Sequence, residues 1–153
     1  MEQKTFFIRA EFCTGCGICQ LACSLIKEKE ASPAIAWISI KRLVMDGIML
    51  PQICVNCTKP RCMEACRRKA IVKDAETGWV TISQEKCNDC TLCIAACPFS
   101  AITLTPQKKV QLCDVCDGNP KCVAMCPTGA IQFANRNRGV AGSTDKAVVN
   151  IWK

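Results

Sequence analysis

The sequence predicts an α+β fold in which short helices and short β-hairpins are joined by many loops, and three observations lead to it. The 153 residues contain 16 cysteines but only 5% aromatic side chains, so the chain has little material for a large apolar core. Short strand-like runs end at Gly, Pro or Asp. The cysteines form four quartets, numbered in chain order: Cys13, Cys16, Cys19, Cys23; Cys54, Cys57, Cys62, Cys66; Cys87, Cys90, Cys93, Cys97; and Cys113, Cys116, Cys122, Cys126.

The spacing within the quartets points to a metal cluster. The first and third read C-x2-C-x2-C-x3-C, the ligand spacing of a [4Fe–4S] cluster. Gly15 and Gly17 suit a loop that closes tightly around such a group. The fourth cysteine of such a run ligates the neighbouring cluster in two-cluster proteins, and Pro98 and Pro127 follow it in the last two quartets as that pattern has it. With no cysteine left over, the sequence predicts four [4Fe–4S] clusters.

Two other uses of cysteine fit less well. A disulfide scaffold needs an even number of cysteines but not four near-copies of one spacing. Structural zinc usually takes two C-x2-C pairs separated by a longer stretch, which differs from closely packed triplets. A zinc-binding interaction module is therefore the alternative from a different functional class, and it would be colourless and free of iron.

An internal repeat supports pairs of related units. The dipeptide Ala-Ile begins four positions after the last cysteine of three quartets, at Ala70, Ala101 and Ala130. Residues 71–83 read as a β-hairpin with its turn at 74–78, and residues 102–105 read as another short strand. Two ancestral units explain this repetition.

The longest interval between quartets predicts a small sheet. A helical turn after Cys23 continues through the charged residues 27–30, and two apolar strands follow near 35–45 and 48–53, separated by the turn signal Asp46-Gly47. Residues 5–8 have the β-branched and aromatic character to pair with this sheet. Trp37 and Trp79 are expected in the core or at an interface.

By size the chain is one domain, residues 1–153, which pairing of quartets divides into two lobes. After Phe133 the composition becomes polar, so residues 134–153 are expected to form a tail that begins as a loop. Residues 148–152 regain strand character and are expected to pack on the domain itself. Because the organic core is thin, we expect the chain without iron to be largely unfolded.

The basic composition is interpreted as compensation for cluster charge. The formal charge is +7 with neutral thiols, but four clusters would add about −8 to −12 and leave about −1 to −5. Without base-stacking aromatics among the basic residues, nucleic-acid binding is not expected. Five basic residues crowd the second quartet, where they either raise a cluster potential or form a solvated face: Lys59, Arg61, Arg67, Arg68 and Lys69.

The sequence offers neither a membrane segment nor catalytic groups of its own. No run of 18 apolar residues occurs, and residues 1–9 lack the apolar region of a signal peptide, so direct membrane insertion is not expected and a reducing cytoplasm is the expected compartment. There is no histidine, no G-x-G-x-x-G and no Walker lysine loop. Sixteen thiolates on four cubes leave no iron open for a substrate. We therefore expect no catalytic residue and a role in one-electron transfer.

The chain resembles the four-cluster ferredoxin-type electron-transfer subunits of complex iron–sulfur oxidoreductases. The resemblance runs from Phe12 to Ala130 and is strongest in C-V-N-C-T-K-P-R-C-M-E-A-C and C-D-V-C-D-G-N-P-K-C-V-A-M-C-P-T-G-A. It implies tandem bacterial-ferredoxin-like units, each with two [4Fe–4S] clusters. In the family the first quartet pairs with the fourth as an outer pair, and the second pairs with the third as an inner pair.

The resemblance also implies the ligand sets. The outer pair would be held by Cys13, Cys16, Cys19 and Cys126, and by Cys113, Cys116, Cys122 and Cys23. The inner pair would be held by Cys54, Cys57, Cys62 and Cys97, and by Cys87, Cys90, Cys93 and Cys66.

Family members accompany several kinds of enzyme. The opening F-C-T-G-C-G-I-C-Q-L-A-C-S-L is most similar to small subunits of tungsten-containing aldehyde oxidoreductases. That similarity implies a large tungsten or molybdenum pterin subunit as one partner and a flavin subunit or a ferredoxin as the other, with self-stacking into longer assemblies as a further expectation. The alternatives are a CO dehydrogenase, hydrogenase or formate dehydrogenase partner, or a free-standing polyferredoxin.

Overall fold

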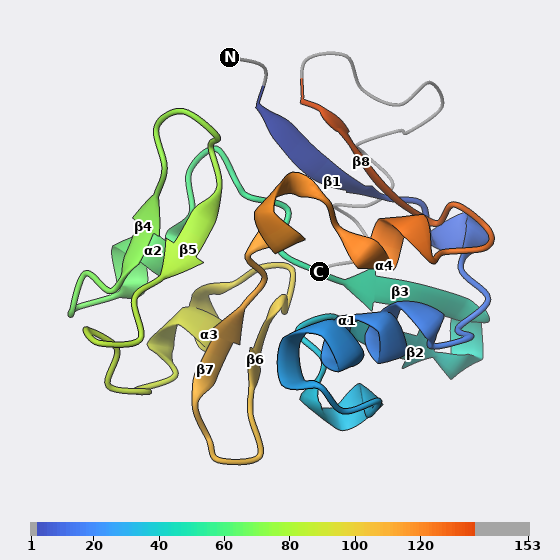
Figure 1. Cartoon of the computed structure of the whole chain (residues 1–153), viewed down its shortest axis with the longest axis horizontal. Helices are drawn as coiled ribbons and strands as arrows, with labels where there is room; N and C mark the ends of the chain where they lie inside the picture. Colours follow the sequence, from blue (N-terminus) through green and yellow to red (C-terminus); the bar gives the residue numbers. More distant parts are fainter. Residues whose placement is uncertain (1–2, 137–153) are drawn as a thin grey trace.

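The computed structural model describes residues 3–136, and these form a loop-rich α+β fold (Figure 1). The strands are β1 (Lys4–Ile8), β2 (Ser39–Leu43), β3 (Ile48–Gln52), β4 (Ile71–Lys73), β5 (Val80–Ile82), β6 (Ile102–Leu104), β7 (Val110–Leu112) and β8 (Ile131–Asn135). The α-helices are α1 (Ile18–Glu28), α2 (Arg61–Ala65), α3 (Leu92–Ala96) and α4 (Lys121–Ala124). The 3-10 turns are η1 (Ala10–Phe12), η2 (Pro33–Ile35), η3 (Val44–Asp46) and η4 (Val115–Gly118). The α+β class and the loop-rich character predicted from the sequence are therefore confirmed.

The strand pairing is nested: the first and last described strands pair with each other, and three hairpins lie between them in the sequence. Within residues 3–136 the strands form four antiparallel pairs, of which β2–β3, β4–β5 and β6–β7 are hairpins, while β1 pairs with β8 from the other end of the described chain. Helix α1 packs against α4, and α2 packs against α3 (Figure 1). The first and fourth quartets therefore lie together, as do the second and third.

Most of the predicted local elements are present. The hairpin expected over 71–83 is β4–β5, and the strands expected on either side of Asp46-Gly47 are β2 and β3. Strand β6 matches the expected strand at 102–105, and α1 continues past Cys23 to Glu28. Strand β7 was not predicted. Strand β8 runs to Asn135, past the point at which a loop was expected, and the expected strand at 148–152 lies outside the described residues.

The expected partner of residues 5–8 was wrong. Strand β1 does not join β2 and β3 but pairs with β8 in a register that places Phe6 opposite Phe133. The two rings lie 4.9 Å apart between centroids, and Phe6 and Ile8 are buried with Ile131. This packing decides the pairing, because the residues of β1 would suit either neighbour equally well.

The β1–β8 pair also contacts the loop of the second quartet. The Thr5 hydroxyl donates a hydrogen bond to the carbonyl oxygen of Val55. The Arg136 guanidinium donates to the carbonyl oxygen of Asn56 and, over 3.0 Å, to the Thr58 hydroxyl. Strands from the two ends of the described chain are thus tied to the inner part of the molecule.

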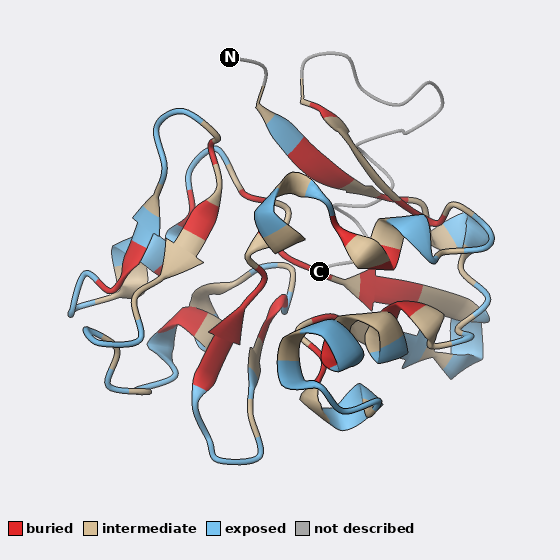
Figure 2. Ribbon diagram, viewed as in Figure 1, coloured by how far each residue is buried: buried red, intermediate tan, exposed pale blue. Residues whose placement is uncertain are grey.

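The core is a thin layer made of aliphatic side chains and cysteines (Figure 2). Its most buried members include Leu50 and Val115 at 0% exposure and Ile38 at 1%. One cysteine of each quartet's helix is buried, namely Cys19, Cys62, Cys93 and Cys122. Trp79 packs against this core, as expected from the sequence.

Candidate metal-cluster sites

Four cavities lie among the cysteines, and each is lined by three members of one quartet and one member of another. We name each cavity after the quartet that supplies three residues. The cysteines of the quartet-one cavity are Cys13, Cys16, Cys19 and Cys126; of the quartet-two cavity Cys54, Cys57, Cys62 and Cys97; of the quartet-three cavity Cys87, Cys90, Cys93 and Cys66; and of the quartet-four cavity Cys113, Cys116, Cys122 and Cys23. These are the four sets that the family resemblance implies, and their assignment as ligands stays a prediction.

The four cavities are similar in size, and all are open to solvent. Their volumes, including the solvent-open mouths, lie between ≈ 290 and ≈ 340 Å³. Among residues 3–136, no three His, Cys, Asp or Glu side chains converge on a point that could hold a single metal ion. A tetrahedral zinc site needs such convergence, with Zn–S bonds of about 2.3 Å. The four cysteines of each cavity therefore surround a space instead of meeting at one point, an arrangement that a multi-atom cluster would suit.

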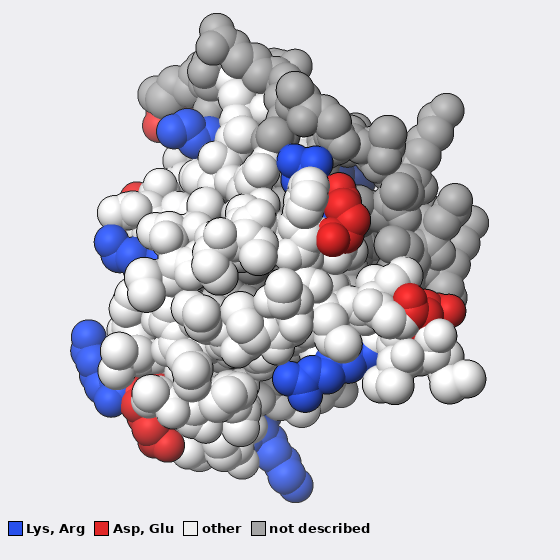
Figure 3. Space-filling view, turned by 90° about the vertical axis from the view of Figure 1, so that its right-hand side faces the viewer, with Lys and Arg blue, Asp and Glu red and all other residues white. Residues whose placement is uncertain are grey.

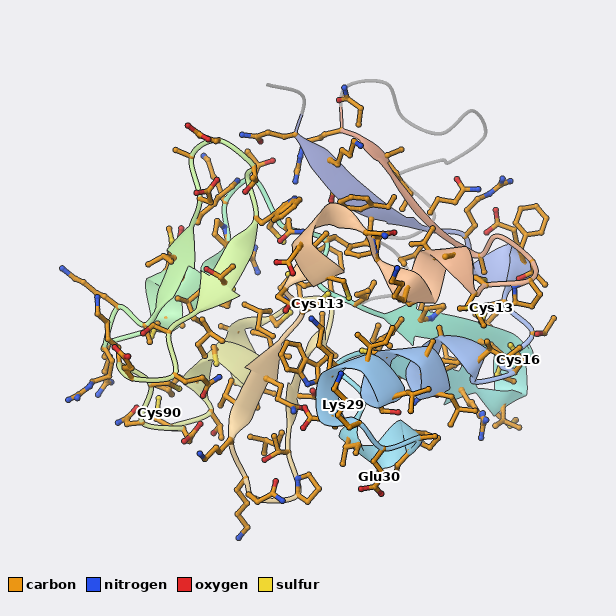
Figure 4. The ribbon with its side chains drawn as sticks, in the orientation of Figure 1. Cys13, Cys16, Lys29, Glu30, Cys90 and Cys113 are labelled. Carbon is orange, nitrogen blue, oxygen red and sulfur yellow. The ribbon has the colours of Figure 1, made fainter. Side chains whose placement is uncertain are left out.

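The cavities are distributed across the molecule. In Figure 4, Cys13 and Cys16 lie at one edge, Cys90 lies near the opposite edge, and Cys113 lies between them. Cys16 and Cys90 are exposed, whereas Cys113 is buried. The arrangement thus has two solvent-facing ends and a buried middle.

The loop between the first two cysteines of every quartet contains a residue in the left-handed backbone conformation. The second residue of this loop has positive φ in each case: Gly15 (71°), Asn56 (49°), Asp89 (54°) and Val115 (63°). Gly, Asn and Asp adopt this conformation most readily, while a β-branched residue there is strained. Val115 is fully buried, so its packing holds a backbone conformation that its side chain disfavours.

Asn56 and Asp89 make equivalent hydrogen bonds. The Asn56 Oδ1 accepts the backbone N–H of Val80, the first residue of β5, over 2.9 Å. The Asp89 Oδ1 accepts the backbone N–H of Val110, the first residue of β7, over 2.8 Å. Each side chain therefore fixes a cysteine loop to the hairpin that follows its own quartet. These two residues were not identified from the sequence, although their shared place in C-x-N-C and C-x-D-C was a usable signal.

The Ala-Ile repeat places backbone N–H groups on sulfur. The N–H of Ala70 donates to Cys66 Sγ over 3.3 Å, and the N–H of Ala101 donates to Cys97 Sγ over 3.5 Å. The N–H of Ala130 makes the corresponding contact with Cys126. The alanines are 0–2% exposed, so a larger side chain would not fit there.

The direction in which each thiol pKa is shifted depends on the balance between burial and nearby hydrogen-bond donors. Burial raises the pKa of Cys19 and of Cys113 to about 12. Burial also acts upward on Cys66 and Cys126, but the pKa of each is lowered below its ordinary value by backbone N–H donors, joined at Cys126 by the Thr128 hydroxyl. The cysteines that cross to another quartet's cavity at these two places therefore sit where negative charge on sulfur is stabilised.

One ion pair borders the quartet-four cavity. Lys27 Nζ lies 2.5 Å from Asp114 Oδ2, and Trp37 lies beside Lys27 with its indole nitrogen donating to Glu28 over 2.9 Å. Burial lowers the pKa of Lys27, but Asp114 and the thiolates of Cys116 and Cys113 outweigh that effect, so the pKa is raised. Lys27 thus stays protonated beside this cavity.

Charge is unevenly placed around the other cavities. Arg61 lines the quartet-two cavity and Arg68 lines the quartet-three cavity. The residues that line the quartet-one cavity include no charged side chain. The face at that end of the molecule has a broad uncharged area, with charged side chains around it (Figure 3). The two ends of the cysteine series therefore differ in electrostatic character.

Within residues 3–136, no helix has both the length and the apolar content needed to cross a bilayer.

Comparison with known proteins identifies relatives of the chain. Residues 45–136 match the family described as "4Fe-4S dicluster domain". The chain is 37% identical over 126 residues to the "Aliphatic sulfonate oxidoreductase, polyferredoxin-like subunit" of Pyrococcus furiosus, covering 82% of this chain and 72% of that protein. It is 36% identical to the "NADH-dependent phenylglyoxylate dehydrogenase subunit beta" of Aromatoleum evansii, over 78% of this chain but only 28% of that protein.

Two further comparisons are more distant. The "Formate dehydrogenase-O iron-sulfur subunit" of Escherichia coli is 28% identical over 88% of this chain and 54% of its own length. Among solved structures, a chain of the "Active site complex BamBC of Benzoyl Coenzyme A reductase in complex with Benzoyl-CoA" aligns with a TM-score of 0.52 and 21% identity, over 99% of this chain and 89% of that chain. At that identity the match shows a shared fold.

Proposed function

We propose that this chain, which belongs to the 4Fe-4S dicluster domain family, is an electron-transfer subunit of an oxidoreductase complex and holds four [4Fe–4S] clusters. One observation carries the proposal: every one of the 16 cysteines lines one of four cavities, four to a cavity, and each cavity takes three from one quartet and one from another. We accordingly assign the four cysteines of each cavity as ligands of one cluster, within a tandem arrangement of two-cluster units.

The residues around the cavities fit this role. Clusters of this kind accept and return single electrons when bound. The chain contributes apolar walls that exclude water, backbone N–H groups that stabilise negative charge on sulfur, and Lys27 as a fixed positive charge. With one thiolate on each iron of a cluster, no iron would be open to a substrate, so catalysis would take place in another subunit.

For the partner we propose a large catalytic subunit of the tungsten or molybdenum pterin type, with an aldehyde oxidoreductase as the specific candidate. The opening stretch around the first quartet supports this choice. A flavin subunit or a ferredoxin would exchange electrons with the complex on the other side, in the cytoplasm, where thiols stay reduced. The relatives named as subunits of an aliphatic sulfonate oxidoreductase and of formate dehydrogenase support a subunit role in general.

The experiment is anaerobic purification of the tagged chain from its own cell, with metal analysis. We expect about 16 irons per chain and a large co-purifying subunit that contains tungsten or molybdenum. A catalytic subunit with nickel would replace the proposed partner, and an iron-loaded chain without any stable partner would indicate a free-standing polyferredoxin. A zinc-loaded, colourless chain would overturn the whole proposal.

The crossing of cysteines between quartets has its own test. Cys97→Ala should reproduce the electron paramagnetic resonance changes of Cys57→Ser, because both residues line the quartet-two cavity. It should differ from Cys90→Ser, which alters the quartet-three cavity. If Cys97→Ala instead matched Cys90→Ser, each quartet would hold its own cluster and the assignment would be wrong.

A further inference from the structure

The residues from Lys59 to Lys69 form a basic segment beside the quartet-two and quartet-three cavities. It comprises α2 and the residues on both sides of it, with five basic side chains and a single acidic one, Glu64, for a net charge of +4. All five basic side chains are exposed: Lys59, Arg61, Arg67, Arg68 and Lys69. Side chains ending in nitrogen project from this edge of the molecule, the edge on which Cys90 is labelled (Figure 4).

Within residues 3–136, these cations have no acidic partner in an ion pair. Among residues 3–136 the ion pairs are Arg9 with Glu11 and Lys27 with Asp114, and neither involves the basic segment. The nearest carboxylates along the chain after Lys69 are those of Asp74 and Glu76, in the turn beyond β4. The segment therefore keeps a net positive charge that no ion pair within residues 3–136 offsets.

The basic segment borders both inner cavities. Arg61 lines the quartet-two cavity and Arg68 lines the quartet-three cavity, while Cys57 is half-buried and Cys90 is exposed. Arg67 and Lys69 line neither cavity. Exposed cations at such positions act weakly on a buried group because water screens them, but they act strongly on a charged molecule that approaches from solvent.

We propose that the basic segment is the docking surface for an acidic one-electron carrier protein. This inference rests on the proposed function, since the carrier would give one electron to the oxidised chain or take one from the reduced chain, with no other reactant. Charge complementarity selects an acidic partner, and polar interfaces of this kind suit short-lived redox encounters. The segment contains no Phe, Trp or Tyr on which nucleic-acid bases could stack, so a protein carrier is favoured over a nucleic acid.

The test uses the iron-loaded chain and an acidic bacterial 2[4Fe–4S] ferredoxin as the probe. The variant is Arg67→Glu with Lys69→Glu, which reverses two charges that line no inner cavity. The matched control is Lys108→Glu with Lys109→Glu, the same charge change in the exposed turn between β6 and β7. Stopped-flow measurements follow electron transfer from reduced ferredoxin to the oxidised chain and, separately, from the dithionite-reduced chain to an uncharged quinone.

With ferredoxin at low ionic strength, we expect the second-order rate constant of the Arg67/Lys69 variant to fall about 10- to 100-fold. It should return to the native value near 1 M salt, where the screening length is about 3 Å. The Lys108/Lys109 control should change by less than about threefold, and the rate with the quinone should be unchanged in both variants.

The other outcomes would overturn the inference. Equal losses with ferredoxin and with the quinone would mean that the charges act on the clusters rather than on docking. An unchanged rate with ferredoxin would remove the docking surface but leave the proposed function intact. Micromolar binding of a DNA or RNA duplex, abolished by the same variant while ferredoxin still reacts, would assign the segment to nucleic acid. A native, fully iron-loaded chain that exchanges electrons with neither probe would instead refute the proposed function.

Discussion

Replacing Asn56 with Ala should destabilise the protein more than the loss of its hydrogen bond to the Val80 N–H alone suggests. Asn56 is 0% exposed, and its Oδ1 accepts the N–H of Val80, which is itself 1% exposed. Removing the acceptor leaves a buried N–H without a partner, at a cost of about 1–3 kcal/mol. Position 56 also has φ of 49°, and Ala tolerates this conformation less well than Asn by about 1 kcal/mol.

The sum is about 2–4 kcal/mol, which for a chain of this size corresponds to a fall of about 5–15 °C in the midpoint of thermal unfolding. The assay heats the protein anaerobically and monitors unfolding as the loss of visible absorption. The scan rate is held fixed because metal loss makes unfolding irreversible. Asn119→Ala is the control, since Asn119 is exposed in a loop of the fourth quartet. Equal midpoints for the Asn56 and Asn119 variants would refute the reasoning.

Three further predictions concern other parts of the fold. Ala70→Leu should cost about 1–3 kcal/mol, because Ala70 is fully buried with its N–H on Cys66 Sγ, whereas Ala75→Leu in an exposed turn should bleach at the native temperature in the same assay. Asp74→Ala should lower the bleaching temperature: the N–H and hydroxyl of Thr77 lower the pKa of the Asp74 carboxyl. A carboxyl whose pKa is depressed by folding contributes stability above its unfolded pKa, near 3.8, and that stability is lost as the pH falls through the folded pKa. The difference in bleaching temperature between Asp74→Ala and the native protein should therefore be constant from about pH 5 to 8. A difference that varied over this range would contradict the assignment. Lys27→Met should lower a reduction potential in a redox titration, because it removes the positive charge beside the quartet-four cavity and leaves Asp114 unpaired, while Lys29→Met, outside that cavity, should not; a potential that rose in Lys27→Met would exclude this role.

Local patterns accounted for most of what could be predicted from the sequence. The hairpins β2–β3 and β4–β5 were found because each joins apolar runs through a nearby turn signal. The Ala-Ile repeat was found because it recurs at a fixed offset from cysteine, and the structure supplies its cause in the N–H to sulfur contacts. Strand β7 was missed because Val110–Leu112 runs directly into Cys113, with no turn residue to mark its end, unlike the equally short β6, which ends before Pro106.

Contacts between distant residues could not be predicted in the same way. The pairing of β1 with β8 joins Phe6 to Phe133, and nothing in the alternation of residues 4–8 distinguishes this partner from β2. The hydrogen bonds of Asn56 and Asp89 to the following hairpins also join residues that are not local, 24 and 21 positions apart. The signal that could have revealed them was the place of Gly15, Asn56 and Asp89 as the residue before the second cysteine, and Val115 interrupts that pattern in the fourth quartet.

The pairing of the two end strands gives a physical reason for the nested order of the quartets. Strand β1 precedes the first quartet and β8 follows the fourth, so their antiparallel pairing brings α1 and α4 together at one end. The second and third quartets are then left to face each other through α2 and α3. Because Thr5 of β1 and Arg136, the residue after β8, also bond to the loop at 55–58, the outer sheet holds the inner loop in place as well. The geometry of the quartet-two cavity should therefore depend on residues at both ends of the described chain, even though none of them is a cysteine.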